Sequence, residues 1–197
     1  MYSPAQDGRT RLRSVARDAV REQISHVALD LFDEHGFENV TIEQVAGHAG
    51  ISVRSVHRYF PAKEDLVVGM LEANGEFVRD VLLTRPTSEP ALLSLHAVYV
   101  DLVRTGSDAP HYRLAMRLLS STPALRARNV EKHLAWAELL TPVVAERLDG
   151  ADAILRARVL VEVSLTAFTL SMIAWADDPA GRSMEELLDA AFLDLTR

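Results

Sequence analysis

Residues 41–63 restrict the fold of this chain more than any other stretch of the sequence. Apolar residues recur there at helical spacing on both sides of Gly50, in two short runs. Thr41 and Gln44 form a T-x-x-Q capping box, which is typical of a helix N-terminus, and Ser52 is well placed to cap a second helix. The stretch therefore predicts two short helices that are joined by a tight turn.

A longer helix is expected before these two. Its apolar residues share one face, and Gly36 follows at a point where glycine commonly ends a helix in the left-handed conformation. The face consists of Val20, Ile24, Val27, Ala28, Leu31 and Phe32. Pro61 predicts the start of a fourth helix, to about Leu83, because proline lacks the N–H that the first helical turn leaves unbonded. Residues 1–13, which are rich in arginine, are expected to form a mobile basic arm.

The remainder of the chain also shows helical spacing of its apolar residues. No long stretch alternates apolar and polar residues with a bias to β-branched types, as half-buried strands do. We expect Pro142 to kink or divide one of the helices. The predicted helices cover approximately residues 90–105, 110–121, 123–148, 151–177 and 183–195. The sequence therefore predicts an all-α protein.

Composition excludes several classes of protein. Hydrophobic residues make up 48% of the 197-residue chain, which is enough for a packed core, yet no apolar run reaches the roughly 18 residues of a membrane span. The arginines near the N-terminus are not followed by an apolar stretch, so a secretory signal is not expected. The chain has no cysteine, which excludes disulfides and thiolate metal sites and fits a reducing cytoplasm. We therefore expect a cytoplasmic protein with no membrane partner.

An enzyme or a metal protein is the main alternative from another class, and the sequence does not favour it. The seven histidines contain no H-x-x-x-H or H-E-x-x-H pair, and no G-x-S-x-G, Walker or dinucleotide-binding pattern is present. We therefore predict no catalytic residue, no metal site and no cofactor. A helical dimer that acts as a scaffold, or binds a small molecule without DNA activity, stays open as an alternative.

The second short helix, residues 52–59, has two different faces. Val56 lies four residues before Phe60, so both face the preceding helices. The opposite face carries Val53, Arg54, Ser55, His57 and Arg58. Such a helix fits the major groove of DNA, where an arginine fork pairs with guanine and a valine touches a thymine methyl group. The formal net charge of −7 does not argue against DNA binding, because binding depends on the local field at one face.

The pattern across residues 20–66 closely resembles that of the TetR family of transcriptional regulators. The residues that carry the resemblance are Phe32, Gly36 and Phe37 at the end of the first helix, Thr41 at the start of the second, Ala49, Gly50, Ile51 and Ser52 in the turn, and Tyr59, Phe60, Lys63 and Glu64 after it. The resemblance implies an N-terminal three-helix DNA-binding domain with a helix-turn-helix over residues 14–66. It implies a C-terminal helical domain for ligand binding and dimerisation over residues 67–197.

Site residues follow from the resemblance and from the exposed face together. Thr41, Ser52, Tyr59 and Lys63 are expected to contact phosphates, with helix capping alone as the alternative for the first two. Arg54, Ser55 and His57 are the expected base readers, and Arg58 lies toward the edge of the face. The family usually has tyrosine at position 57, and lysine and glycine at positions 53 and 54. The operator preference of relatives is therefore not expected to apply to this chain.

The last two predicted helices indicate a partner. Apolar residues surround much of residues 151–177, which is typical of a helix buried on more than one side, and residues 183–195 carry an apolar stripe. The resemblance implies that these two helices form a homodimer, with burial inside one subunit as the alternative. A two-fold dimer would place two reading helices in successive major grooves about 34–36 Å apart, so the DNA partner is expected to be a palindromic operator.

The C-terminal part is also expected to bind a small molecule. Small-molecule sites are mostly apolar with few polar anchors, so we expect a lipophilic or aromatic effector. The candidate lining residues are Tyr99, Met116, Trp136, Phe168, Met172 and Trp175, with His133 and Glu162 as possible polar anchors. Around Pro123, Leu125, Arg126 and Arg128 this part loosely resembles actinobacterial members of the family linked to redox or acyl-CoA metabolism, which does not specify a ligand.

Overall fold

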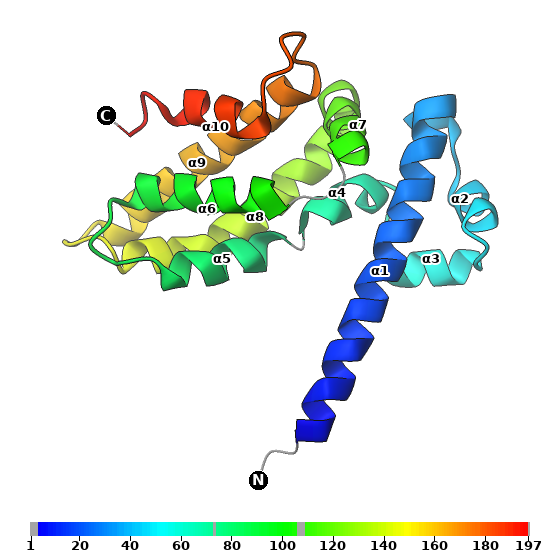
Figure 1. Ribbon diagram of the computed structural model, residues 1–197, viewed down its shortest axis with the longest axis horizontal. Coiled ribbons are helices and arrows are strands. Elements are labelled where there is room, and N and C mark those ends of the chain that lie inside the picture. Colours follow the sequence, from blue (N-terminus) through cyan, green and yellow to red (C-terminus); the bar gives the residue numbers. More distant parts are fainter. Residues whose placement is uncertain (1–3, 73, 106–108, 197) are drawn as a thin grey trace. The chain divides into compact units, whose positions relative to one another are not determined.

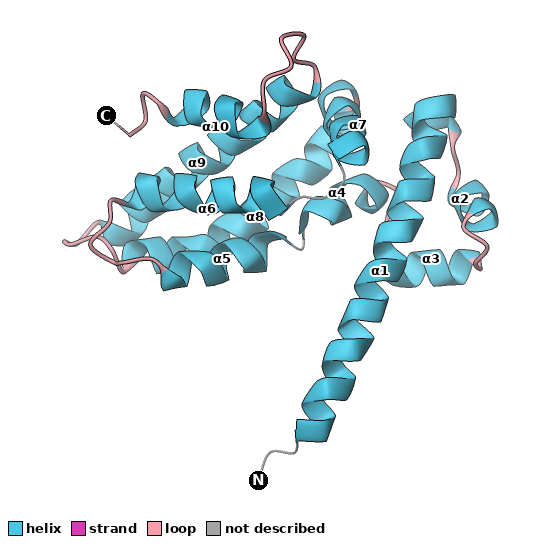
Figure 2. Cartoon of the chain, viewed as in Figure 1, coloured by secondary structure: helices cyan, strands magenta, loops and turns pink. Residues whose placement is uncertain are grey.

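The computed structural model describes residues 4–72, 74–105 and 109–196, and every regular element within these ranges is a helix (Figure 2). The chain divides into two compact units, residues 1–70 and residues 71–197. The predicted all-α class is therefore confirmed.

The first unit contains the predicted helix-turn-helix (Figure 1). Its helices are α1 (Pro4–His35), the short 3-10 helix η1 (Phe37–Asn39), α2 (Ile42–His48), α3 (Val53–Tyr59) and most of α4 (Asp65–Glu72). α1 packs against α2, and α2 packs against α3. Val20, expected on the buried face of α1, is 39% exposed, whereas Leu29 is fully buried.

α1 begins earlier than the sequence pattern predicted. The helix starts at Pro4, so residues 4–13, expected as part of a mobile arm, are its first turns. Proline is well tolerated in a first helical turn, and the arginine, alanine, glutamine and leucine residues that follow have high helix propensity. The side chains of residues 1–15 lie outside the described part of the chain, so the mobility of the arm stays a prediction.

The fourth helix also differs from the prediction of one helix over residues 61–83. It begins at Asp65, because the Asp65 carboxylate accepts a hydrogen bond from the Ala62 N–H at 2.9 Å and closes a turn before the helix. α4 is described to Glu72 and α5 over Asn74–Thr84, and residue 73 between them lies outside the described residues.

The second unit is a helical bundle with α9 at its centre (Figure 1). α9 packs against α6, α7, α8 and α10, while α5 packs against α6 and α8. Pro142 does not divide α8, which continues for less than one turn beyond it. The helices after α5 are α6 (Ala91–Thr105), α7 (Ala109–Ser121), α8 (Pro123–Ala145), α9 (Ala153–Ala176) and α10 (Met184–Phe192).

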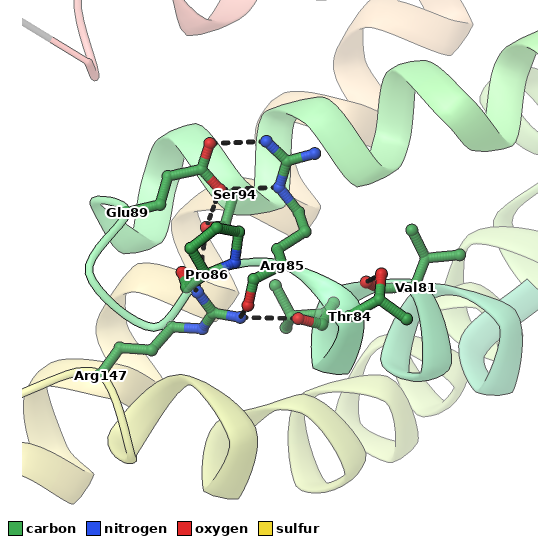
Figure 3. A network of polar contacts seen from close by, with 8 residues as sticks. Val81, Thr84, Arg85, Pro86, Glu89, Ser94 and Arg147 are labelled. Atoms are coloured by element: carbon green, nitrogen blue, oxygen red, sulfur yellow. Dashed lines mark hydrogen bonds and ion pairs between the residues drawn. The ribbon is translucent and has the colours of Figure 1, made fainter.

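Arg147, just after α8, binds the C-terminal end of α5 through hydrogen bonds (Figure 3). Its guanidinium donates hydrogen bonds to the carbonyl oxygens of Leu82 at 2.6 Å, Arg85 at 3.2 Å and Pro86 at 2.7 Å. These carbonyls belong to the last turn of α5 and the residues after it, where the regular i to i+4 bonding of the helix ends. The neighbouring Glu89 carboxylate accepts bonds from Arg85, so the whole turn between α5 and α6 is held by charged hydrogen bonds.

One helix, α9, is long and apolar enough to cross a membrane by length and composition alone. Polar residues interrupt its apolar ones, so it contains no long unbroken apolar run. Half of its most apolar part is buried inside the protein, as in the core helices of soluble proteins.

Candidate nucleic-acid interface and ligand cavity

Local hydrogen bonds define the start of both short helices. Thr41 accepts a bond from the Gln44 N–H through its hydroxyl at 3.3 Å, and the Gln44 side chain accepts one from the Thr41 N–H at 2.8 Å. The predicted capping box is therefore present. Ser52 caps α3, since its hydroxyl accepts a bond from the Ser55 N–H at 3.1 Å. In the turn between the helices Gly50 has a φ of 69°, in the left-handed region that favours glycine.

α3 presents the predicted face to solvent. Val56 is fully buried, and Phe60, directly after the helix, is 1% exposed. Arg54, His57 and Arg58 are exposed, and their spacing of three and four residues puts them on one face. Val53 and Ser55 are half-buried at the margins of this face, with Ser55 held by the Ser52 cap. The arrangement leaves two arginines and an imidazole able to approach another molecule.

Tyr59 and Lys63, the expected phosphate contacts, both have partners inside the unit. The Arg58 guanidinium lies over the Tyr59 ring at 5.0 Å from its centre. The Lys63 ammonium donates to the carbonyl oxygens of Phe37 at 2.8 Å and Val40 at 3.1 Å, so it ties the segment before α4 to η1. An ammonium has three N–H groups, and these two bonds use two of them. A phosphate contact by the third N–H of Lys63 stays a prediction.

A cavity lies in the second unit, between the start of α5 and helices α7, α8 and α9. The space between its walls is about 280 Å³ when counted out to its mouth, but the interior has room for little more than one water molecule. Four of the eight predicted ligand residues line it: Met116, Trp136, Phe168 and Met172. The sequence did not point to its other lining residues, which are Asn74, Tyr112, Leu119, Asn129, Lys132 and Thr169.

Buried polar groups make this cavity chemically distinct from the apolar core. Lys132 and Asn129 are each 6% exposed, and the Lys132 ammonium lies 5.0 Å from the centre of the Trp136 ring. Asn129 Oδ1 and Trp136 Nε1 are buried and have no hydrogen-bond partner among the described residues. Burial raises the pKa of Tyr112 to about 12, although a hydrogen bond with Asn74 opposes this. Buried polar atoms usually have partners, so the cavity wall has unused hydrogen-bonding capacity.

The other four predicted ligand residues lie away from the cavity surface. Tyr99 stacks behind Phe168 with ring centres 4.7 Å apart, and His133 lies 2.8 Å from the hydroxyl of the lining residue Thr169. Glu162 pairs with Arg158 at 2.7 Å, and Trp175 lies beneath the Arg113 guanidinium. Aromatic or charged character alone did not reveal which side of each helix faces the cavity.

Comparison with known proteins agrees with this architecture. Residues 24–70 match the model of the bacterial regulatory proteins of the TetR family, and residues 90–197, more than half of the chain, match the MftR C-terminal domain. MftR of Mycobacterium tuberculosis, named as a mycofactocin biosynthesis transcriptional regulator, is 26% identical over 89% of each chain. The transcriptional regulator TcmR of Streptomyces glaucescens is 29% identical over 67% of this chain and 61% of its own length.

Solved structures show the same fold. NalD, the secondary repressor of the MexAB-OprM multidrug efflux pump of Pseudomonas aeruginosa, has a TM-score of 0.59 at 21% identity and covers 91% of this chain and 95% of its own. The repressor FadR of Thermus thermophilus, solved with lauroyl-CoA, has a TM-score of 0.55 at 23% identity and covers 89% of this chain and 93% of its own. Together with the family models, these likenesses show that the chain belongs to the TetR family of transcriptional regulators, with a C-terminal domain of the MftR type.

Proposed function

We propose that this TetR-family regulator is a cytoplasmic repressor that occupies a palindromic operator as a homodimer and is released by a small lipophilic or aromatic effector. The observation that carries the proposal is the cavity of the second unit, whose largely apolar walls include two buried polar atoms, Asn129 Oδ1 and Trp136 Nε1, with no hydrogen-bond partner among the described residues. The first unit presents an exposed reading face on α3. A ligand site and a DNA-reading face in one chain are the two parts that an effector-controlled repressor needs.

The cavity lining indicates the kind of effector. Met116, Leu119, Phe168 and Met172 offer apolar and aromatic contacts to the body of a ligand. Lys132 and Asn129 offer a cationic and an amide group to one polar end. A ligand larger than water requires these side chains to move apart, because the cavity is small in this structure.

A route from the cavity to the DNA-binding unit runs through α5. Asn74 at the start of α5 lines the cavity, and a Cβ added at Gly75 would lie only 2.7 Å from Trp136 Nε1. The other end of α5 is fastened by Arg147. A ligand that displaces Trp136 would therefore shift the start of α5, next to α4, whose first six residues belong to the first unit. Release requires the effector to bind the DNA-free state more tightly than the DNA-bound state.

The proposed dimer uses mainly α9. Ile154, Leu155, Val159, Val163 and Leu170 of this helix are between 38% and 65% exposed, an unusual number of large apolar side chains for one helix. The apolar stripe of α10 is buried in its own subunit through Leu187, Leu188 and Phe192. The C-terminal end of α10 would therefore contribute, where Leu193, directly after the helix, is 54% exposed.

The decisive experiment is a gel-shift selection from genomic fragments, starting with the DNA beside the gene for this chain. Footprints on the retained fragments should show two half-sites about one helical turn apart, and candidate lipophilic compounds should release the protein. If no fragment is retained, the helical dimer without DNA activity would replace this proposal. An effector that binds tightly without changing operator affinity would contradict the allosteric part.

Arg54 provides the residue-level test of DNA reading. Arg54→Ala should relax the base preference at one position of each half-site and cost about 1–3 kcal/mol of binding free energy, because a guanidinium–guanine pair is lost. Binding selections on randomised half-sites would measure both effects. Arg79→Ala, on the surface of α5, serves as the control and should change neither. Uniform weakening on all sequences would assign Arg54 to a phosphate instead.

A further inference from the structure

Arg21 on α1 binds the end of the reading helix from inside the first unit. Its guanidinium donates a hydrogen bond to the carbonyl oxygen of Tyr59 at 3.0 Å. Tyr59 is the last residue of α3, where helical carbonyls lack partners and carry partial negative charge. A cation at this position satisfies one of those carbonyls and stabilises the C-terminal end of α3.

The same guanidinium lies in a site shaped by α3 and α4. Its central carbon is 4.8 Å from the centre of the Phe60 ring, which is 1% exposed. A Cβ added at Gly69 of α4 would lie 3.1 Å from Arg21 Nη2 and 3.4 Å from the Phe60 ring. Glycine therefore leaves the space that the guanidinium and the ring occupy, and Arg21 of α1 lies against both α3 and α4.

α3 depends on such contacts for its orientation. The helix has only seven residues, and helices this short have little stability of their own. Within it Val56 is the one fully buried side chain. The direction of the exposed face therefore depends on the packing of Val56 and α2 along the helix, and on Arg21 and Phe60 at its C-terminal end.

We infer that Arg21 is a positioning residue for DNA recognition: it fixes α3 against α1 and α4, and thereby aims Arg54 and His57, without touching DNA. The inference rests on the proposed role of α3 as the reading helix. A site that reads bases needs side chains held to within about half an ångström, and a seven-residue helix with one fully buried side chain needs a further contact at its C-terminal end to hold them so. Gly69 is part of the same arrangement, because its lack of a side chain leaves room for the Arg21 guanidinium.

The test compares Arg21→Met with Arg17→Met on the operator fragment recovered by the selection above. Methionine keeps an unbranched apolar side chain over Phe60 but removes the donor to Tyr59. Arg17, one turn earlier on α1, is exposed and serves as the control. We expect at least ten-fold weaker operator binding for Arg21→Met, relaxed preference at the bases read by α3, and less than a two-fold change for Arg17→Met. Gly69→Ala should act in the same direction as Arg21→Met.

Salt dependence separates positioning from direct contact. A residue that binds phosphate lowers the slope of log affinity against log salt by about one when it is removed, whereas a positioning residue leaves the slope unchanged. A reduced slope for Arg21→Met would therefore overturn the inference, and so would wild-type affinity. A loss fully accounted for by the unfolded fraction, measured by thermal melting, would also overturn it.

Hydrogen exchange tests the inference without DNA. The amides of residues 56–60 should exchange faster in Arg21→Met than in the wild type, while those of α2 change little. Unchanged exchange in α3 would contradict the anchoring role. A wild-type protein that retains no DNA fragment would instead contradict the proposed function, and the exchange result would still decide whether Arg21 anchors the helix.

Discussion

His133 shows how a single side chain beside the cavity is controlled by its surroundings. Burial, and then the positive charge of Lys132, lowers the pKa of its imidazole from 6.5 to about 4. The ring is therefore neutral near pH 7, and its Nε2 lies 2.8 Å from the Thr169 hydroxyl and 3.3 Å from the Asn129 amide nitrogen. A neutral ring can orient both lining residues without adding a second buried positive charge to the cavity wall.

Stability should fall as the pH drops from about 6.5 to about 4. In this window the unfolded chain binds a proton at His133 that the folded chain does not bind, so acid favours unfolding. Urea unfolding of the wild type and of His133→Gln between pH 7.5 and pH 4.5 would measure the effect. The wild type should lose stability more steeply than the variant, and parallel profiles would contradict a depressed pKa at this residue.

At the scale of the element, the C-terminal end of α5 is bound by Arg147, and its N-terminal end lies on the cavity wall. Arg147 holds the carbonyls at its C-terminal end, while Asn74 and Gly75 at its start approach Tyr112 and Trp136. The two ends of α5 therefore differ in their contacts, and its start lies next to α4 in the chain. This geometry is what makes the helix a candidate for relaying the state of the cavity.

Replacing Arg147 by methionine should lower the free energy of unfolding by roughly 2 kcal/mol. The change removes charged hydrogen bonds to Leu82, Arg85 and Pro86, although the Leu82 and Pro86 carbonyls keep the backbone N–H groups of Arg85 and Glu89 as donors. Arg79→Met on the same helix removes only a surface pair with Asp80 and should cost less than about 0.5 kcal/mol. Equal midpoints for the two variants in urea would show that the Arg147 network adds no stability.

Most helices could be predicted from the sequence because their signals are local. The T-x-x-Q box, the Ser52 cap and the apolar spacing of α6 to α9 act within a few residues, and the structure follows them closely. The start of the fourth helix at Asp65 and not at Pro61 could not be predicted from the apolar spacing, since it accompanies the bond between the Asp65 carboxylate and the Ala62 N–H.

The two candidate sites were predictable to different degrees, because one depends on local spacing and the other on contacts between distant segments. The exposed face of α3 follows from the spacing of one short helix. The cavity depends on how four distant segments pack, so Lys132 and Asn74 gave no signal in the sequence, while Tyr99 and Trp175 are buried elsewhere. Arg21 was one arginine among several, and its bond to Tyr59 spans 38 residues of chain.

At the scale of the whole molecule, the exposed apolar residues of α9 support the proposed homodimer. Val159 is 52% exposed and Leu170 is 59% exposed, so they add little to the core of their own subunit. A two-fold dimer built on such a surface would double the number of phosphates that each protein molecule contacts on DNA.

The double variant Val159→Glu, Leu170→Glu should therefore be a folded monomer. Charges introduced into the proposed interface oppose association, while the exposed positions tolerate them within the subunit. Sedimentation would give the oligomeric state, and operator titrations should show a salt slope about half that of the wild type. Leu83→Glu, an exposed residue of α5, is the control and should stay dimeric. A double variant that remains a dimer would place the interface elsewhere.

The tightness of the cavity has a consequence for how fast such a switch responds. An interior with room for little more than a water molecule admits an effector only after its walls have opened. Once the effector is abundant, it meets the protein faster than the cavity opens. The rate of effector binding then levels off at the rate at which the cavity opens. Beyond that concentration, more effector no longer shortens the delay before release, and the protein itself determines how quickly its genes respond.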